Sequence, residues 1–209
     1  MKQIGNYGEQ FKAEVHQISP ERKILLKRAA SAISVEVTEQ NTPVKLMFIC
    51  THNSRRSQLA QAWAFVFAEH YFPNVFEVYS GGTEVTACHL NTLKSLINLG
   101  FDVQTRETST GNAKHGLKFH NRSLSLYSKL YNSPEHPSNH FIAFMTCAQA
   151  SKNCPVVFGA KHRFNFNFED PKRFDATPNA ITEYEKTALK IGRELHFLFD
   201  LVKHQTHTN

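Results

Sequence analysis

The residues best suited to chemistry lie in one short stretch, in which the apolar run Leu46–Ile49 ends at Cys50 and a polar segment follows as far as Ser57. Arg56 completes the spacing Cys-x5-Arg-Ser. A cysteine thiolate is a strong nucleophile, and a guanidinium can hold two oxygens of a tetrahedral oxyanion with its planar fork. Where such a stretch turns from a strand into a helix, backbone N–H groups and the positive helix end face the same anion. The pattern predicts a phosphate-type oxyanion site that carries its own nucleophile.

The residues that follow Cys50 then form the oxyanion-binding loop, and the serine after Arg56 is placed to hydrogen-bond the sulfur. The predicted loop residues are Thr51, His52, Asn53, Ser54, Arg55 and Ser57. The bare pattern also arises by chance, as an inert buried cysteine followed by surface arginines. A strand before it, a helix after it and an asparagine within it favour the site.

A second requirement is an acid that protonates the oxygen leaving phosphorus or arsenic. Asp170 precedes Pro171 at the end of FNFEDP, where alternating phenylalanines predict a strand. We therefore expect Asp170 in a loop at the same sheet edge as Cys50, as the general acid. The alternative role for Asp170 is a turn cap before proline. Glu169 is the weaker candidate for the acid, because its place in the alternation turns it away from the phenylalanines.

The cysteines Cys147 and Cys154, in MTCAQASKNCPVV, distinguish two chemistries. Phosphoester hydrolysis needs one thiolate, whereas reduction of an oxyanion needs two electrons and hence a second thiol, and a third can pass the disulfide outward. Along a continuous helix the two would be about 10.5 Å apart, and a disulfide tolerates only about 7 Å between Cα atoms. A bond between them therefore requires a loop or an unwound helix. The alternative is that both are packed core thiols, and Cys88 is interpreted as structural.

Strands and helices alternate from Val44 onwards. The predicted strands are Val44–Ile49, Phe76–Ser80, Phe141–Thr146 and a fourth through Phe164, Phe166 and Phe168. The predicted helices are Gln58–Tyr71, Asn91–Leu99 and the periodic stretch from Ile181 to Val202. This order favours a parallel sheet covered on both faces, with ligands at the carboxyl ends of the strands. The predicted fold class is α/β, a three-layer sandwich around a four-stranded parallel sheet.

Two segments lie outside this core. Residues 1–43, whose apolar positions recur at helical spacing, are expected to form an N-terminal helical extension to a catalytic domain at 44–209. An insertion at about 114–139 is polar and rich in serine and histidine. Within it, Leu117–Phe119 and Leu124–Tyr127 are expected to pair as a small hairpin.

The composition is that of a folded domain with an appendage, with 209 residues of which 41% are hydrophobic and 20% charged. The net charge of +6 favours anionic partners, but an ordinary basic surface explains it better than either a small anion or nucleic acid does. No nucleic-acid motif accompanies the charge, so nucleic acid is not expected, and the small oxyanion expected as a partner follows from the Cys50 loop. Without a membrane-spanning run or a signal peptide, we expect a cytoplasmic protein whose cysteines are reduced at rest. The twelve histidines show no metal-ligand spacing, so neither a metal nor a tightly bound cofactor is expected.

A resemblance to the low-molecular-weight tyrosine phosphatase fold, and within it to the thioredoxin-coupled arsenate reductases, rests on FICTHNSRRSQLAQAW, YSGGTEVTA, MTCAQASKNCPVV and FNFEDP. It runs from Val44 to the last helix, and its most specific feature is the spacing of Cys147 and Cys154 with the proline that follows. The extension and the insertion have no counterpart in the minimal fold. The resemblance implies these roles: Cys50 the nucleophile, Arg56 the oxyanion clamp, Asp170 the acid, and Cys147 with Cys154 the redox pair.

The same resemblance implies the reduction of arsenate to arsenite. Cys50 attacks arsenate while Asp170 protonates the departing oxygen. Cys147 then attacks Cys50 and releases arsenite, and Cys154 attacks Cys147. Thioredoxin, an external thiol reductant, reduces the disulfide that results.

Two other functions use the same residues. A phosphatase of phosphotyrosine or small phosphoesters would act through a phosphocysteine intermediate, and its Cys147–Cys154 pair would protect Cys50 from overoxidation. A non-catalytic module that senses phosphate or oxidation is the third alternative, although a pure binder needs no nucleophile. The number of subunits and the role of residues 1–43 stay open at this point.

Overall fold

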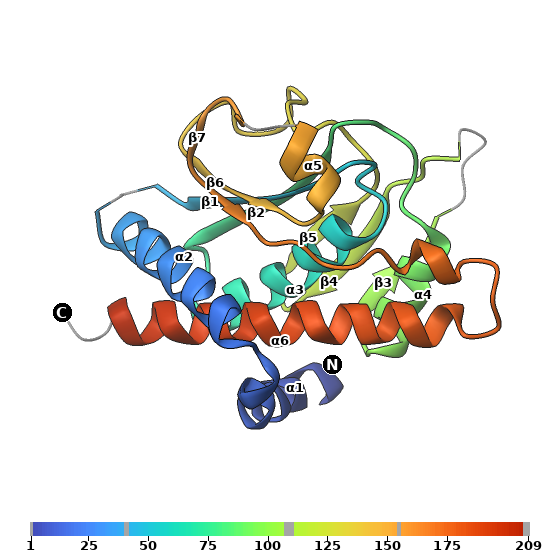
Figure 1. Ribbon diagram of the computed structural model, residues 1–209, viewed down its shortest axis with the longest axis horizontal. Coiled ribbons are helices and arrows are strands. Elements are labelled where there is room, and N and C mark those ends of the chain that lie inside the picture. The colour runs from blue at the N-terminus through green and yellow to red at the C-terminus, as the bar shows by residue number, and fades with distance from the viewer. Residues whose placement is uncertain (1, 40–41, 107–110, 154–155, 207–209) are drawn as a thin grey trace.

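A computed structural model describes residues 2–39, 42–106, 111–153 and 156–206 (Figure 1). The strands are β1 Val44–Cys50, β2 Phe76–Gly82, β3 Asp102–Gln104, β4 His115–Phe119, β5 Arg122–Leu126, β6 Phe141–Met145 and β7 Ala160–Asn165. The α-helices are α1 Lys2–Ala13, α2 Pro20–Glu39, α3 Arg56–Tyr71, α4 Leu90–Asn98, α5 Ala148–Asn153 and α6 Ala180–Thr206. Two 3-10 turns are η1 Glu14–Gln17 and η2 Pro171–Phe174. None of the helices in these described ranges is both long and apolar enough to cross a membrane.

The main sheet has four strands in the order β2-β1-β6-β7, and every neighbouring pair is parallel. The predicted fold class, a three-layer α/β sandwich with a four-stranded parallel sheet, is therefore confirmed. All four strands end at the same edge of the sheet. The residues that follow them are consequently brought together there.

The fourth strand differs from the prediction. It is β7, which begins at Ala160 and ends at Asn165, so that Phe166 and Phe168 lie beyond it. All three phenylalanines are buried, as their alternation indicated. The ladder stops because the Phe166 N–H turns back to the Phe164 carbonyl at 3.1 Å, and the chain rejoins the sheet edge only through Phe168 N–H, which donates to Thr146 O at 3.1 Å.

The two faces of the sheet are covered unequally. Helices α2, α3 and α6 form a thick layer on one face, and α5 lies on the other (Figure 1). The side chains of β1 alternate between the two: Leu46 and Phe48 join the helical layer, whereas Met47 and Ile49 join a smaller cluster with Ala150 of α5. Burial on both faces explains why β1 is an almost unbroken apolar run.

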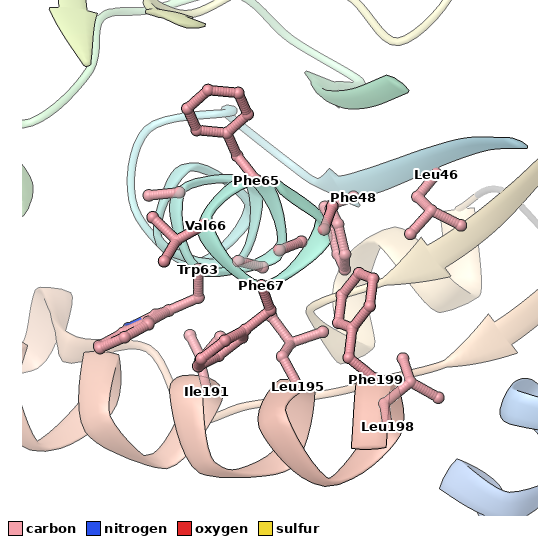
Figure 2. Close-up of a cluster of buried hydrophobic side chains, with 14 of the residues drawn as sticks. Leu46, Phe48, Trp63, Phe65, Val66, Phe67, Ile191, Leu195, Leu198 and Phe199 are labelled. Carbon is pink, nitrogen blue, oxygen red and sulfur yellow. The ribbon is translucent and has the colours of Figure 1, made fainter. Parts of the chain in front are cut away.

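The helical layer is an aromatic core built around α3. Figure 2 shows Trp63 and Phe67 on the side of α3 that faces Ile191 and Leu195 of α6. Thirteen of the sixteen residues of α3 are buried, since α3 lies between the sheet and α6. Burying rings of this size is among the largest favourable contributions that a side chain makes, so the helix that follows the cysteine loop is firmly anchored.

The N-terminal segment is helical, as predicted, and its longer helix, α2, runs as far as Glu39. The ring of Phe11 packs edge-on against Trp63 at 5.3 Å, so α1 covers the far side of the α3–α6 layer.

The insertion contains the predicted hairpin, since β4 and β5 pair antiparallel with Leu117 opposite Leu124. A third strand, β3, was not predicted; it pairs antiparallel with β4 and completes a small second sheet.

Candidate active site

Three of the predicted residues lie at the carboxyl edge of the main sheet. Cys50 is the last residue of β1, Cys147 follows the end of β6 by two residues, and Asp170 follows the end of β7 by five. The loop after Cys50 runs directly into α3, which begins at Arg56. The order of the strands thus gathers the nucleophile candidate, a second thiol and the acid candidate around one crevice.

The Cys50 sulfur is almost enclosed, with the residue 4% exposed, and it is held by two polar contacts. Ser57 Oγ lies 3.0 Å from Sγ, and the Asn53 backbone N–H donates to Sγ at 3.1 Å. The contact from Ser57 is the one that the spacing predicted. These two contacts fix the position of the sulfur at the base of the loop.

The backbone carbonyls of the loop all point outward. Each carbonyl from Cys50 to Ser54 accepts a hydrogen bond from a neighbouring segment. The donors, in order, are Thr83 N; Glu84 N; Thr86 Oγ1 with Ser128 Oγ; Gln58 Nε2; and His89 N with Thr92 Oγ1. A loop whose carbonyls are fixed outward has its N–H groups free to turn inward, which is the geometry of an anion-binding nest.

The Asn53 side chain holds this loop to two distant segments. Its Nδ2 donates to Ser57 Oγ at 2.8 Å and to Ser80 Oγ at 2.9 Å, while its Oδ1 accepts from the Lys129 backbone N–H at 3.1 Å. Asn53 has a φ of 47°, a left-handed conformation that asparagine tolerates better than most residues. Sequence reasoning placed Asn53 in the loop but missed Ser80 and Lys129.

Gly82 allows the loop to come this close. A Cβ on this residue would lie 2.6 Å from Thr51 O and 2.9 Å from Asn53 N. Any side chain here would displace the loop, so the second glycine of YSGG has a steric role that its place at a strand end did not reveal.

Arg56 and Asp170 are paired with each other. An Nη2 hydrogen bond joins Arg56 to Oδ2 of Asp170, and Nη1 donates to Phe168 O at 3.0 Å. Nε of Arg56 is buried and has no acceptor among the described residues. The Asp170 carboxylate also accepts from Lys172 N–H at 3.0 Å, so it caps η2. The turn-cap role and the place beside the arginine therefore coexist in one residue.

The Arg55 side chain, predicted in the oxyanion loop, is directed to a separate cluster. It pairs with Asp175 at 2.5 Å and donates to Tyr184 Oη, and Tyr184 in turn donates to Asp175 at 2.5 Å. The ring of His89 stacks on Tyr184. Burial comes first among the causes that raise the pKa of Tyr184, followed by its hydrogen bond to Asp175. Tyr184 lies in the periodic stretch predicted from Ile181 to Val202, but that period gave no sign of the cluster with Arg55 and Asp175.

The side chains of the remaining loop residues make fewer contacts. His52 is partly exposed with Nε2 3.4 Å from Glu84, and Ser54 is buried beside the crevice. Thr51 Oγ1 lies 3.5 Å from the Cys147 sulfur.

Cys147 is buried next to the loop, with only 1% of the residue exposed. Its sulfur also accepts from the Ala150 N–H at 3.3 Å, which fixes it at the start of α5. Cys147 and Cys50 belong to the same buried cluster beneath α5. Cys154, the other half of the predicted pair, lies outside the described residues. Cys88 is buried just before α4, where loss of hydration raises the pKa of its thiol to about 12, as suits a packed thiol.

A pocket of about 830 Å³ opens beside the loop, bounded by the loop, the start of α4, the insertion and η2. Its basic residues are Arg55, Lys94, Arg106 and Lys172, and Asp175 is the one carboxylate among its described lining residues. Burial lowers the pKa of His89 and of His115, two of the lining histidines, so these two favour the neutral form. The pocket is therefore built to accept negative charge.

Comparisons with known proteins define the class of fold. A YwlE mutant from Bacillus subtilis superposes with a TM-score of 0.54 at 17% identity, over 77% of this chain and 99% of that one. A low molecular weight phosphotyrosine phosphatase from Vibrio cholerae O395 superposes with a TM-score of 0.52 at 16% identity, over 75% and 95%. The fold is that of the low-molecular-weight phosphatases, as predicted.

Sequence similarity points to one group of enzymes with this fold, the arsenate reductases. The chain is 26% identical over 132 residues to an arsenate reductase of Shouchella clausii strain KSM-K16, which is 63% of this chain and 77% of that protein. No protein-family model matches the chain. The predicted resemblance is thus confirmed, and the chain is a divergent relative of these enzymes.

Proposed function

We propose that this chain is an arsenate reductase. The observation that carries the proposal is the place of Cys147, whose buried sulfur lies 3.5 Å from Thr51, the residue next to Cys50 in the loop. Hydrolysis itself uses no second thiol, and in a phosphatase Cys147 would serve only to protect Cys50 from overoxidation. A reductase needs one, because two electrons must leave the thiols to convert arsenic from the +5 to the +3 state.

Oxyanion binding is assigned to the loop Cys50–Ser57 and the start of α3. The N-cap of α3 is Arg55, and no described side chain caps its N–H groups. An anion at this position would accept from those amides and from the unpaired Nε of Arg56. Arsenate and phosphate share the tetrahedral shape and the charge that such a site recognises.

The proposed first step forms a sulfur–arsenic bond. The Cys50 thiolate attacks arsenate, and one oxygen departs as water after taking a proton from Asp170. In the structure Asp170 is bound to Arg56. The entering anion would draw the guanidinium towards itself and leave the carboxyl group next to the departing oxygen.

The next two steps move the oxidation away from the loop. The Cys147 thiolate attacks the Cys50 sulfur, so that arsenite leaves with two electrons and a Cys50–Cys147 disulfide remains. The Cys154 thiolate then attacks Cys147, which frees Cys50. Thioredoxin or another external dithiol reduces the final disulfide.

The last step requires α5 to change. Residues 148–153 are helical, and a helix between the two cysteines would hold them about 10.5 Å apart along its axis. A disulfide allows about 7 Å between Cα atoms. We therefore propose that α5 unwinds when Cys154 attacks, and that the bond between Cys147 and Cys154 keeps it unwound.

Disulfide mapping tests this proposal. Fully reduced protein is given arsenate, or phosphate as the control anion, and its disulfides are identified by peptide mass. We expect a Cys147–Cys154 bond with arsenate only, and a trapped Cys50–Cys147 bond in Cys154→Ser. If every thiol stayed free with arsenate, the reductase proposal would be wrong.

A second candidate is hydrolysis of a phosphoester through a phosphocysteine on Cys50. The basic pocket beside the loop favours it, because about 830 Å³ is far more room than a bare oxyanion needs. Cys147→Ser separates the two functions. Arsenate reduction should vanish in this variant, whereas hydrolysis of an aryl phosphate should be retained.

A further inference from the structure

Arg22 of α2 reaches across to the segment that connects β7 to Asp170. Its Nη2 donates to the Asn167 carbonyl at 2.8 Å, and Nη1 lies 3.4 Å from the Asn165 carbonyl. Its guanidinium also lies over two rings of this segment, 4.5 Å from the centre of Phe166 and 4.8 Å from that of Phe168. A planar, delocalised cation suits both kinds of contact at once.

The other edge of the guanidinium is fixed by α6. Nε of Arg22 donates to Glu194 Oε2 at 2.6 Å, and the Glu194 side chain is only 5% exposed. Burial raises the pKa of this carboxyl, and the charge of Arg22 opposes that shift. A buried carboxylate is costly without its partner, so Arg22 is held between α6 and the 165–168 segment.

Phe168, whose ring lies under the Arg22 guanidinium, is itself hydrogen-bonded to residues of the candidate active site. Phe168 O accepts from Nη1 of Arg56 at 3.0 Å, and Phe168 N–H donates to Thr146 O, next to Cys147. Asp170 follows two residues later. The backbone of this segment therefore sets where Asp170 stands relative to Arg56, and the side chain that packs on it from outside belongs to the N-terminal extension.

We propose that Arg22 is a positioning residue for the general acid, so that the N-terminal extension takes part in the reaction by holding the segment before Asp170. This inference rests on the proposed role of Asp170. It also gives residues 1–43 a function beyond packing.

A second ion pair provides a matched control. Arg193 of α6 donates to Glu14 of η1 at 2.8 Å, so this pair also joins the extension to α6. Within the described residues, no hydrogen bond or ion pair connects Glu14 to the 165–168 segment. Loss of the Glu14 pair should loosen the extension without moving Asp170.

The test uses the dependence of turnover on the leaving group, which a merely structural role would not alter. General acid catalysis matters for phenyl phosphate, whose alcohol leaves poorly, and little for 2,4-dinitrophenyl phosphate. We expect Asp170→Asn to lower kcat/KM for phenyl phosphate by about 10²-fold or more. Arg22→Lys should lower it about tenfold, because misplacing the acid by less than 1 Å is enough. On the dinitrophenyl ester Arg22→Lys should stay within about twofold of wild type, and Asp170→Asn should lose far less than it loses on phenyl phosphate.

Two further variants guard against misfolding. The double variant Arg22→Met with Glu194→Gln leaves no buried charge unpaired and should show the same selective loss as Arg22→Lys. Glu14→Gln should show no selectivity between the esters. If Asp170→Asn is selective while both Arg22 variants behave like Glu14→Gln, the inference about Arg22 is overturned and the proposed role of Asp170 stands. If Asp170→Asn is not selective, that role fails and the inference falls with it.

If neither ester is turned over, single turnover of arsenate replaces this readout. Formation of the Cys50 adduct needs the acid, whereas the thiol exchange that follows does not. Arg22→Lys should slow the first step about tenfold and leave the second unchanged. Equal rates in both steps for Arg22→Lys and wild type would overturn the inference.

Discussion

A cysteine at the same sheet edge precedes both the loop after β1 and the helix after β6, but the loop and the helix are held very differently. Every carbonyl from Cys50 to Ser54 accepts a hydrogen bond, and Asn53 joins the loop to Ser80 and Lys129. Helix α5 has only six residues, and its first two, Ala148 and Gln149, are exposed. The nucleophile candidate is thus preorganised, whereas the thiol proposed to receive the oxidation begins an element short enough to unwind.

The rigidity of the loop after β1 depends most on Asn53. Asn53→Ala removes three side-chain hydrogen bonds and places a poorly suited residue at a φ of 47°. We expect kcat/KM to fall about 10²-fold, because the loop amides and Ser57 lose their alignment. The free energy of unfolding should fall by about 2–4 kcal/mol. Steady-state kinetics and urea denaturation measure the two effects.

Asn74 is the control for backbone strain. It also has a positive φ, of 63°, and lies in the turn before β2, at the opposite edge of the sheet. Asn74→Ala should cost about 1 kcal/mol of stability, through its conformation and the loss of an exposed hydrogen bond from Arg122, and leave turnover unchanged. If both alanine variants lost the same activity, the preorganisation assigned to the loop would be wrong.

A second prediction concerns the lysine whose backbone holds the loop. Burial lowers the pKa of Lys129 from its ordinary value of 10.5 to about 8, despite the opposing charge of Glu135. Between these two pH values the unfolded chain retains a proton that the folded chain has lost. Stability from this group therefore rises with pH across that window, by about 2 kcal/mol between pH 7 and pH 10.

Lys129→Met should remove the part of the pH dependence of stability that comes from Lys129. The comparison is the change in the free energy of unfolding from pH 7 to pH 10, measured in urea for both proteins. Cys88, with its pKa raised to about 12, acts in the opposite direction above its ordinary pKa, and it does so in both proteins. Wild type should therefore gain about 2 kcal/mol relative to the variant. A variant that followed the wild-type curve would show that Lys129 is charged in the folded protein at pH 10.

Within the loop, local contacts and long-range contacts differ in how well the sequence predicts them. Cys50, Arg56 and Ser57 lie within eight residues, so their contacts follow from one strand, one turn and one helix. The partners of Asn53 are 27 and 76 residues away, and only the packed fold brings them to the loop. Local patterns predict elements and nearby contacts, but not which distant side chains meet.

The N-terminal extension shows the same limit more strongly. Its helices were predictable from spacing, whereas the contact of Arg22 with Asn167 joins residues 145 apart. The end of β7 was misjudged for a related reason. Three alternating phenylalanines are buried on one side in a strand and also in the irregular segment that continues it, so the period alone does not separate the two.

The smallest expected effect concerns α5, the short helix proposed to unwind, where Ser151 donates to the Asn167 side chain at 2.9 Å. If α5 must unwind for Cys154 to attack Cys147, this exposed bond resists the step by a few tenths of a kcal/mol. Asn167→Ala removes the bond without altering the helix. Transfer of the disulfide from Cys50–Cys147 to Cys147–Cys154 should then be about twofold faster, as measured by rapid quenching, alkylation and peptide mass.

Ser151→Ala removes the same bond but should not give the same result. Alanine favours a helix over serine by a few tenths of a kcal/mol, which stabilises α5 and offsets the lost bond. We therefore expect transfer at close to the wild-type rate in Ser151→Ala and a faster rate only in Asn167→Ala. Equal acceleration in both variants would mean that helix stability does not enter the rate, and hence that the disulfide forms without unwinding α5.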